Sequence, residues 1–443
     1  VVLITTTIIY EGGNMTDKSK RRYFYKTGEF TSILALILQG ILVGLVIGLF
    51  KKSIHFLSDK MLLLFSLARG NFSYKIFILV LFILVGSLIY YLAKKDPNIK
   101  GSGIPIIYGM LDDKFDVDSE KTLIRKFLSS VLTIGIGLTL GREGPSVQIG
   151  GLVGDIVHKR TKSRENKKYF IGSAAGAGIA VAFNAPISGV LFTIEEIFKK
   201  TDRKVFLSTG ITIFTAVITA DLCFGNNPAL KDIPAFDVMS LSMIALLILL
   251  GLVAGLSGVF FNSCIIGSKG FFAKIKINPY IKYMLPFVIT AIVLMIDIEL
   301  FSSSEHFIFL PISGNPSLAC LIFFYFAKIL LLALAFGLGV PGGSLVPLLV
   351  IGSLVGNIFA TSLVCLGLLD SSYILIFSIL GMCGHFSAIV RTPITAIILV
   401  LEMTGGAFNY LLGISIVSLV AYSLAEIMKS KPFYEHLYEL LVK

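Results

Sequence analysis

The chain has 443 residues, of which 55% are hydrophobic and only 15% are charged, and its mean hydropathy is +0.88. Soluble globular domains carry about 45–50% apolar and about 25% charged residues, so this composition excludes a soluble enzyme and indicates a polytopic α-helical membrane protein. The formal net charge of +11 sits in short basic clusters between apolar runs, which is typical of cytoplasmic loops beside anionic lipid and argues against nucleic-acid binding.

The N-terminal segment has two parts. Residues 1–14 lack the basic region of a signal peptide, and their last four residues can be encoded by a purine-rich tract ahead of a start codon for Met15. We therefore expect residues 1–14 to be a translated ribosome-binding leader that is not native. The basic residues between Lys18 and Arg22 precede the first apolar run and predict a cytoplasmic N-terminus.

Apolar runs follow along the rest of the chain. They lie at about residues 31–50, 76–93, 127–140, 169–197, 205–223, 237–262, 283–300, 317–337, 344–367, 373–401 and 409–428. A membrane-spanning helix needs about 20 residues, so the short runs, and those that Gly and Pro interrupt, predict broken helices. Broken spans at matching places in two halves are typical of inverted-repeat transporters.

The sequence contains such matching halves. The segment GPSVQIGGLVGDI at Gly144 resembles VPLLVIGSLVGNI at Val346, 202 positions later. NAPISGVLFTIEE and RTPITAIILVLEM form a second pair, which aligns Glu195 with Glu402 at an offset of 207 positions. We therefore expect a leader and cytoplasmic segment at 1–29, a first transmembrane repeat at 30–223, and a second at 224–443 that includes a C-terminal pore helix.

Three strings rich in Gly or Pro lie where helices are expected to begin. They are Gly101-Ser102-Gly103-Ile104-Pro105, Gly141-Arg142-Glu143-Gly144-Pro145 and Gly343-Ser344-Leu345-Val346-Pro347. Each has a Pro in a first helical turn, where its missing N–H costs nothing. Free N–H groups at helix N-termini bind anions, and partial charges allow an anion to leave again. The alternative is that the strings merely break helices.

Some residues in these strings carry chemistry of their own. Glu143 is ionisable in an apolar setting, which makes it a functional candidate, although a helix N-terminal charge is the alternative. The hydroxyl of Ser102 can donate a hydrogen bond to a halide ion or cap a helix. Tyr434, taken alone, is typical of an interfacial anchor. Lys126 either raises the local potential for anions or extends its ammonium to the interface.

These strings resemble the signature motifs of the CLC family of chloride channels and proton–chloride exchangers. The resemblance runs from about residue 30 to the end, and it is to the short bacterial type without cytoplasmic regulatory domains. It implies an all-α integral membrane fold of the CLC type, an inverted repeat with many tilted and broken helices. It also implies a homodimer in which each subunit holds its own anion pathway, in the bacterial inner membrane with both termini cytoplasmic.

The resemblance also implies residue roles. Glu143 matches the outer gate, which competes with chloride and carries the proton, and Glu196 matches the inner proton acceptor. Ser102, Tyr434 in the string KPFY, and the backbone N–H groups of Ser344 and Leu345 match the chloride site. Leu345 departs from the family's phenylalanine, which puts the constriction of the pore in doubt.

Three further residues have implied or inferred supporting roles. Arg142 is expected to stabilise its loop or the local potential rather than to bind the anion. Glu195 and Glu402, which occupy matching places in the two halves, are expected to be structural.

We therefore expect a secondary active transporter that exchanges chloride for protons and has chloride, protons and lipid as its partners. An uncoupled voltage- or pH-gated chloride channel of the same fold is the first alternative, and a non-transporting anion sensor is the second. The chain has neither a GxSxG string nor a GxxxxGK[ST] phosphate loop, and its Cys and His residues are scattered. We accordingly expect no enzymatic activity, no metal and no cofactor.

Overall fold

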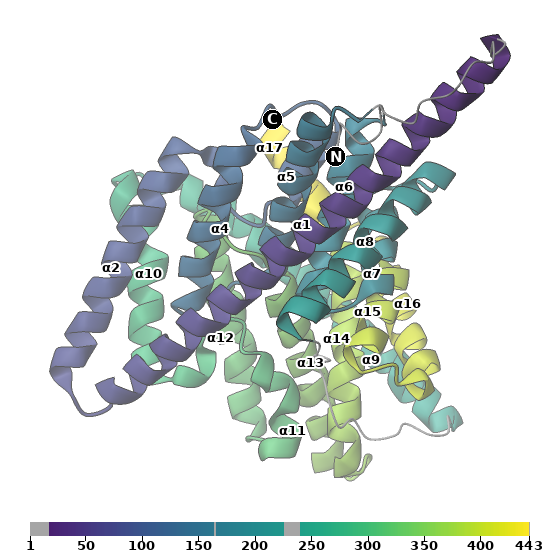
Figure 1. Ribbon diagram of the computed structural model, residues 1–443. Helices are drawn as coiled ribbons and strands as arrows, with labels where there is room; N and C mark the ends of the chain where they lie inside the picture. The colour runs from purple at the N-terminus through teal and green to yellow at the C-terminus, as the bar shows by residue number, and fades with distance from the viewer. Residues whose placement is uncertain (1–16, 164, 226–239, 443) are drawn as a thin grey trace.

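The computed structural model describes residues 17–163, 165–225 and 240–442, and it is built almost entirely of helices (Figure 1). Within these ranges seventeen α-helices occur and no strand of a sheet does. Nine helices in the described ranges are long and apolar enough to cross a membrane. The predicted all-α, multi-pass membrane architecture is therefore confirmed. The predicted leader at residues 1–14 lies outside the described residues.

The first half contains eight helices. They are α1 (Asp17–Ala68), α2 (Phe72–Lys95), α3 (Ile104–Leu111), α4 (Ser119–Gly135), α5 (Glu143–Thr161), α6 (Lys167–Phe183), α7 (Pro186–Phe192) and α8 (Arg203–Phe224). Helix α1 crosses the molecule obliquely and continues well beyond the apolar run at 31–50 (Figure 1). It continues because buried Ile54, Met61, Phe65 and Ala68 keep an apolar stripe at helical spacing.

The second half contains nine helices. They are α9 (Leu241–Lys274), α10 (Pro279–Ile296), α11 (Leu310–Ser313), α12 (Leu318–Gly337), α13 (Leu345–Cys365), α14 (Ile374–Val390), α15 (Pro393–Met403), α16 (Leu411–Ile427) and α17 (Phe433–Val442). The apolar runs at 169–197 and 373–401 each divide into two helices. In both, a proline, Pro186 or Pro393, occupies the first turn of the second helix.

The centre of the molecule is made by two tightly packed helix pairs, α5 with α6 and α13 with α14. Glycines allow the backbones to approach. A Cβ added at Gly154 would lie 2.4 Å from the carbonyl oxygen of Phe170, and one added at Gly356 would lie 2.0 Å from that of Phe377. Small residues at helix contacts are the usual means of close packing in membranes. The two pairs therefore hold α5 and α13, both of which begin at the site described below, in fixed positions.

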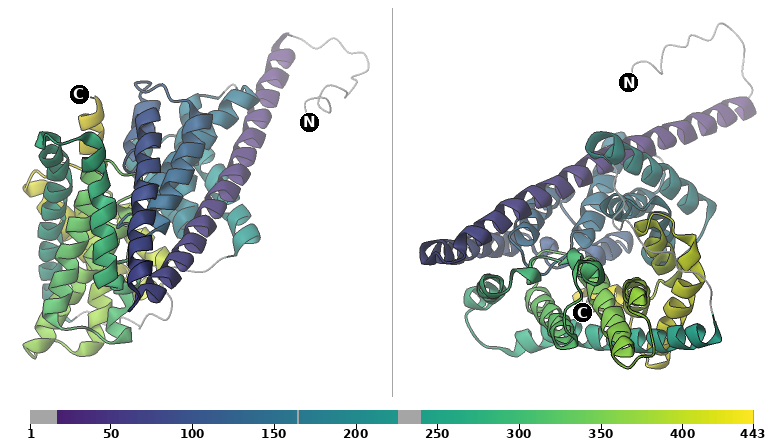
Figure 2. Two further views of the ribbon diagram at one scale, coloured as in Figure 1. Left: turned by 90° about the vertical axis from the view of Figure 1, so that its left-hand side faces the viewer. Right: turned by 90° about the horizontal axis from the view of Figure 1, so that it is seen from below.

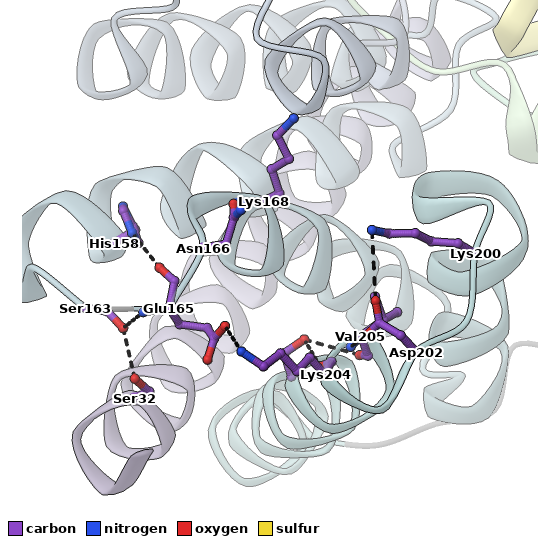
Figure 3. Close-up of polar contacts among 11 residues, drawn as sticks. Ser32, His158, Ser163, Glu165, Asn166, Lys168, Lys200, Asp202, Lys204 and Val205 are labelled. Carbon is purple, nitrogen blue, oxygen red and sulfur yellow. Dashed lines mark hydrogen bonds and ion pairs between the residues drawn. The ribbon is translucent and has the colours of Figure 1, made fainter. Parts of the chain in front are cut away.

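The beginning of α1 and the C-terminal helix α17 lie toward one face of the molecule, which we call the termini face (Figures 1 and 2). Two of the basic clusters meet beside α1, in the loops that follow α5 and precede α8 (Figure 3). There the ammonium of Lys204 lies 2.9 Å from a carboxylate oxygen of Glu165, and the hydroxyls of Ser163 and Ser32 are 3.2 Å apart. These contacts tie α1, α5 and α8 together on that face.

Candidate anion-binding site

The backbones of the three Gly- or Pro-rich strings meet in the middle of the fold. Gly141 and Gly343 form an antiparallel bridge, in which the Gly141 N–H donates to the Gly343 oxygen at 2.7 Å and the reverse bond is 2.6 Å. The Gly342 N–H donates to the oxygen of Gly101 at 3.1 Å. The two halves of the chain are thus joined by backbone hydrogen bonds at the place where helices begin.

Glycine is required for this close approach. A Cβ at Gly144 would lie 2.3 Å from the hydroxyl oxygen of Ser102 and 3.1 Å from the Cα of Gly343. Gly103 has a φ of +92°, and a Cβ there would lie 2.2 Å from the side-chain oxygen of Gln148. A larger residue at Gly144 would push the strings apart, and one at Gly103 would displace the side chain of Gln148 in α5.

Three helices begin at the junction of the strings, α3 at Ile104, α5 at Glu143 and α13 at Leu345. The first N–H groups of a helix have no partner within it, and the aligned peptide dipoles add about half a positive charge. Three such ends side by side make a strongly anion-attracting place without a full positive charge. The structure therefore brings the three strings together at one place.

The carboxylate of Glu143 points into this place. The side chain is fully buried, and one of its oxygens accepts a hydrogen bond from the N–H of Val346, in the first turn of α13, at 3.4 Å. The other oxygen lies 3.5 Å from the Nε of Arg142. A carboxyl group of the chain itself thus accepts a hydrogen bond at the start of α13. Arg142 thus pairs with the carboxylate of Glu143.

Three buried hydroxyls near the strings lack a well-formed hydrogen bond. The oxygens of Ser102, Ser344 and Tyr434 have no hydrogen-bond partner of ordinary geometry within the part of the chain that the structure describes. A buried polar group without a partner costs about 1–3 kcal/mol. A bound anion would accept these donors and remove the cost. Leu345, fully buried at the start of α13, adds apolar wall to the same place.

Cavities reach the strings from both faces of the molecule. On the termini face, a cavity of about 370 Å³ is lined by Ser102, by Leu437 of α17, and by the basic residues Lys100 and Lys269. On the opposite face, a cavity of about 270 Å³ is lined by Arg142 and Val346, among other residues. The junction of the strings therefore lies between two entrances.

Lys126 anchors the first string from inside the protein. Its side chain is fully buried, and its ammonium donates to the carbonyl oxygens of Ile99 at 2.9 Å and Gly101 at 2.6 Å. The interpretation that this lysine extends to the interface is therefore wrong. The reason is that two carbonyl groups at the end of a 3-10 turn offer the ammonium the partners that water would otherwise supply.

Glu196 lies in a π-helical turn, Thr193–Phe198, which follows α7. It is only 3% exposed, and the hydroxyl of Tyr108 donates to one of its carboxylate oxygens at 2.5 Å. Tyr108 belongs to α3, the helix that the string of Ser102 begins, so Glu196 is linked to that string. Sequence reasoning missed Tyr108, although a tyrosine within an otherwise apolar eight-residue helix was a sign of it.

Glu195 and Glu402 make reciprocal contacts between the halves. Glu195 accepts hydrogen bonds from the Thr395 N–H at 2.8 Å and the Thr395 hydroxyl at 2.6 Å, at the start of α15. Glu402 accepts from the N–H of Ile187 at 2.9 Å and from the N–H and hydroxyl of Ser188, at the start of α7. Each carboxylate satisfies the free N–H groups of the partner helix, which bears out the structural role expected for both.

Comparisons with known proteins agree with this geometry. A family model described as Voltage gated chloride channel matches residues 83–426. The chain is 32% identical over 435 residues to the H(+)/Cl(−) exchange transporter ClcA of Vibrio cholerae serotype O1, covering 94% of this chain and 90% of that protein. It is also 32% identical over 421 residues to ClcA of Vibrio vulnificus, covering 92% and 89%.

Solved structures with the same fold include two antiporters. A slow cyanobacterial Cl⁻/H⁺ antiporter has a TM-score of 0.86 and 26% identity, covering 93% of this chain and 98% of that chain. A CLC-type fluoride/proton antiporter has a TM-score of 0.77 and 22% identity, covering 91% and 96%, and at that identity it shows likeness of fold alone.

Proposed function

The chain belongs to the voltage-gated chloride channel family, and we propose that it exchanges chloride for protons across a cell membrane. The observation that carries the proposal is the carboxylate of Glu143, buried against the N–H of Val346 at the start of α13. A titratable anion in an anion site links the two ions: when it is charged it excludes chloride, and when it is protonated it leaves. The relatives reported above are named as exchangers or antiporters, and this favours exchange over an uncoupled channel.

Chloride is bound by partial charges alone in this proposal. The hydroxyls of Ser102 and Tyr434 donate to the dehydrated ion, and the N–H groups of Ser344 and Leu345 add the dipole of α13. The support is that both hydroxyls are buried and that, among the described residues, Ser102 has no partner and Tyr434 faces Ser344 without a hydrogen bond of ordinary geometry. Because no full positive charge contacts the ion, binding stays weak enough for release.

Protons take a partly separate route. We assign Glu143 to proton exchange with one side of the membrane and Glu196 to proton exchange with the other. Burial favours the neutral, protonated form of both carboxyl groups, whereas the Val346 N–H and the Tyr108 hydroxyl stabilise their charged forms.

The arrangement in the membrane follows from charge. We propose that the termini face is cytoplasmic, because its loops carry the basic clusters 158–168 and 199–204, and that the membrane is a bacterial inner membrane. The relatives are bacterial. We also propose two transmembrane repeats, at 30–223 and 224–443, supported by the matching contacts of Glu195 and Glu402.

We propose a homodimer that uses α7, α8, α15 and α16. Support comes from their exposed apolar side chains, such as Ile187, Phe214, Ile394 and Leu419. Chemical cross-linking in liposomes at low protein density tests this: a monomer band alone, at every density, would contradict it.

Purified protein in sealed liposomes tests the exchange. With an outward chloride gradient, chloride and pH electrodes in the external medium record both ions at once. Exchange predicts that chloride efflux drives protons inward and makes the outside alkaline. The variant Glu196→Gln is expected to lose the proton signal and keep chloride flux, whereas Glu195→Gln, the matched control one residue away, is expected to keep both.

The outcomes separate the alternatives. Chloride efflux without proton movement, under conditions where a known exchanger responds, would make the protein an uncoupled channel. Absence of flux for both ions, in protein that binds chloride by calorimetry, would favour a non-transporting sensor.

A further inference from the structure

The loop that carries Ser102 has a second copy in the other half of the chain. Asp96 caps the 3-10 turn Pro97–Ile99 by accepting a hydrogen bond from the Asn98 N–H at 3.2 Å. Asp297, 201 positions later, caps the turn Ile298–Leu300 in the same way, with the Glu299 N–H at 3.0 Å.

The two loops also share their backbone shape and their anchor. Gly101 and Gly103 have φ values of +61° and +92°, and Ser302 and Ser304 have +53° and +55°. Ser302 and Ser304 adopt this left-handed conformation although each carries a Cβ.

The anchor of the second copy is Lys328, which is almost fully buried. Its ammonium donates to the oxygens of Leu300 at 3.0 Å and Ser302 at 2.7 Å, just as Lys126 anchors the first loop. Two unrelated loops would not share a cap, a backbone shape and a buried lysine.

The copies differ in what the central serine contacts. The hydroxyl of Ser102 has no partner among the described residues. Ser303, which occupies the equivalent place, donates to a carboxylate oxygen of Glu305 at 3.3 Å. The same oxygen lies 3.6 Å from a terminal nitrogen of Arg142. The serine hydroxyl of the second loop thus donates to a carboxylate side chain of the protein itself, that of Glu305.

This carboxylate stands at the mouth of the entrance that leads to Glu143. Glu305, Arg142, Lys51 and Val346 all line the cavity of about 270 Å³ on the face opposite the termini. Lys51 and Arg142 also line an adjoining cavity of about 210 Å³, together with Lys52, His55 and Asp221. The ammonium of Lys51 donates to the Val181 oxygen at 2.8 Å, which fixes it at the wall.

We propose that Lys51, Arg142 and Ser303 form an outer docking site for a small monovalent anion, and that Glu305 is a tethered competitor for it. The inference rests on the proposed function and extends it to the step before chloride reaches Glu143. In the structure Arg142 is shared between the buried carboxylate of Glu143 and the half-exposed carboxylate of Glu305. Chloride that arrives at the cavity takes the place of Glu305 on Arg142, and Glu305 turns toward water.

Competition of this kind lowers the apparent affinity for chloride on one side of the membrane only. A half-exposed ion pair is worth little, so its removal changes an affinity about two- to five-fold. Replacing Glu305 by a neutral isostere should therefore strengthen chloride uptake. A residue that merely supported the loop would have the opposite effect when replaced.

Radiolabelled chloride uptake into membrane vesicles tests the inference. Chloride is varied at constant ionic strength with an impermeant anion, in right-side-out and in inverted vesicles. Glu305→Gln is expected to lower the KM for chloride about two- to five-fold in right-side-out vesicles and to leave it unchanged in inverted vesicles. Glu305→Asp, which keeps the charge, should stay near the parent protein, and Lys51→Gln should raise the KM.

Glu299→Gln is the matched control. Glu299 lies in the same loop, is 52% exposed where Glu305 is 48% exposed, and pairs with His306 instead of Arg142. An equal KM in Glu305→Gln and Glu299→Gln, or a higher KM in Glu305→Gln, would overturn the inference and leave the proposed function standing. A parent protein that transports no chloride would overturn both. The KM change in inverted vesicles alone would support the docking site and overturn the proposed orientation.

Discussion

Replacing Tyr108 with Phe removes one hydroxyl and leaves the ring in place. The lost hydrogen bond is the 2.5 Å contact with Glu196, whose side chain is only 3% exposed. Because the hydroxyl stabilises the charged carboxylate, the substitution favours the protonated form of Glu196. We therefore expect exchange to persist to higher pH than in the parent protein.

The size of the effect follows from the kind of hydrogen bond. A hydrogen bond to a charged group contributes about 1.5–3 kcal/mol. Since about 1.36 kcal/mol corresponds to a factor of ten in a protonation equilibrium, the protonated form gains about 10- to 150-fold. The midpoint of the pH dependence of proton-coupled exchange should move upward by about 1–2 pH units.

Liposome flux at a series of symmetric pH values measures this midpoint, with chloride and pH electrodes recording both ions. Tyr438→Phe provides the matched control. The ring of Tyr438 packs edge-on against that of Tyr108 at 5.8 Å, but its hydroxyl donates to Asp112 at 2.6 Å, away from Glu196. If the profiles of Tyr108→Phe and Tyr438→Phe coincide, the reasoning that links Tyr108 to proton supply is refuted.

Three further predictions concern the anion site and its support. Gly144→Ala places a methyl group about where the Ser102 hydroxyl lies and should abolish chloride binding in calorimetry, whereas Gly210→Ala, with open space around it, should bind normally. Lys126→Met leaves two carbonyl groups without their donor and should lower the stability by about 1–3 kcal/mol and weaken chloride binding at the site of Ser102. Lys328→Met should lower the melting temperature in the same way but weaken chloride binding less, because its loop carries Ser303 of the outer site and not Ser102; equal losses of affinity would contradict this. Glu402→Gln should lower the stability by about 1–3 kcal/mol in thermal melting, because it weakens the contact with α7. The ratio of protons to chloride transported should stay unchanged, and an altered ratio would show that Glu402 takes part in coupling.

Much of the site could be predicted because its parts are local in sequence. A Gly- or Pro-rich string followed by a helix predicts a helix N-terminus, and three such strings predict a place for an anion. The duplication could also be predicted, since nearly equal offsets between similar segments, 202 and 207 positions, need no structure. For the same reason Ser102 and Glu143 could be proposed as site residues from the sequence, and Ser344 from the resemblance.

The partners of these residues could not be predicted. Tyr108 meets Glu196 across 88 positions of the chain, and Arg142 meets Glu305 across 163. Neither pair has a local spacing that indicates contact, because only the packing of whole helices brings them together. Lys126 shows the same limit, since its place in sequence is equally compatible with a buried or an interfacial ammonium.

By itself, then, the sequence determined the class of protein, the two halves, the helix-start strings and the kind of ion they attract. These depend on composition, on apolar run length and on the free N–H groups of helix ends, which are all local properties. Only the tertiary structure decided that the strings join through Gly141 and Gly343, and that Lys126 is buried beneath the first of them. It also decided that a second carboxylate stands at one entrance, because the position of Glu305 depends on how the second half folds against the first.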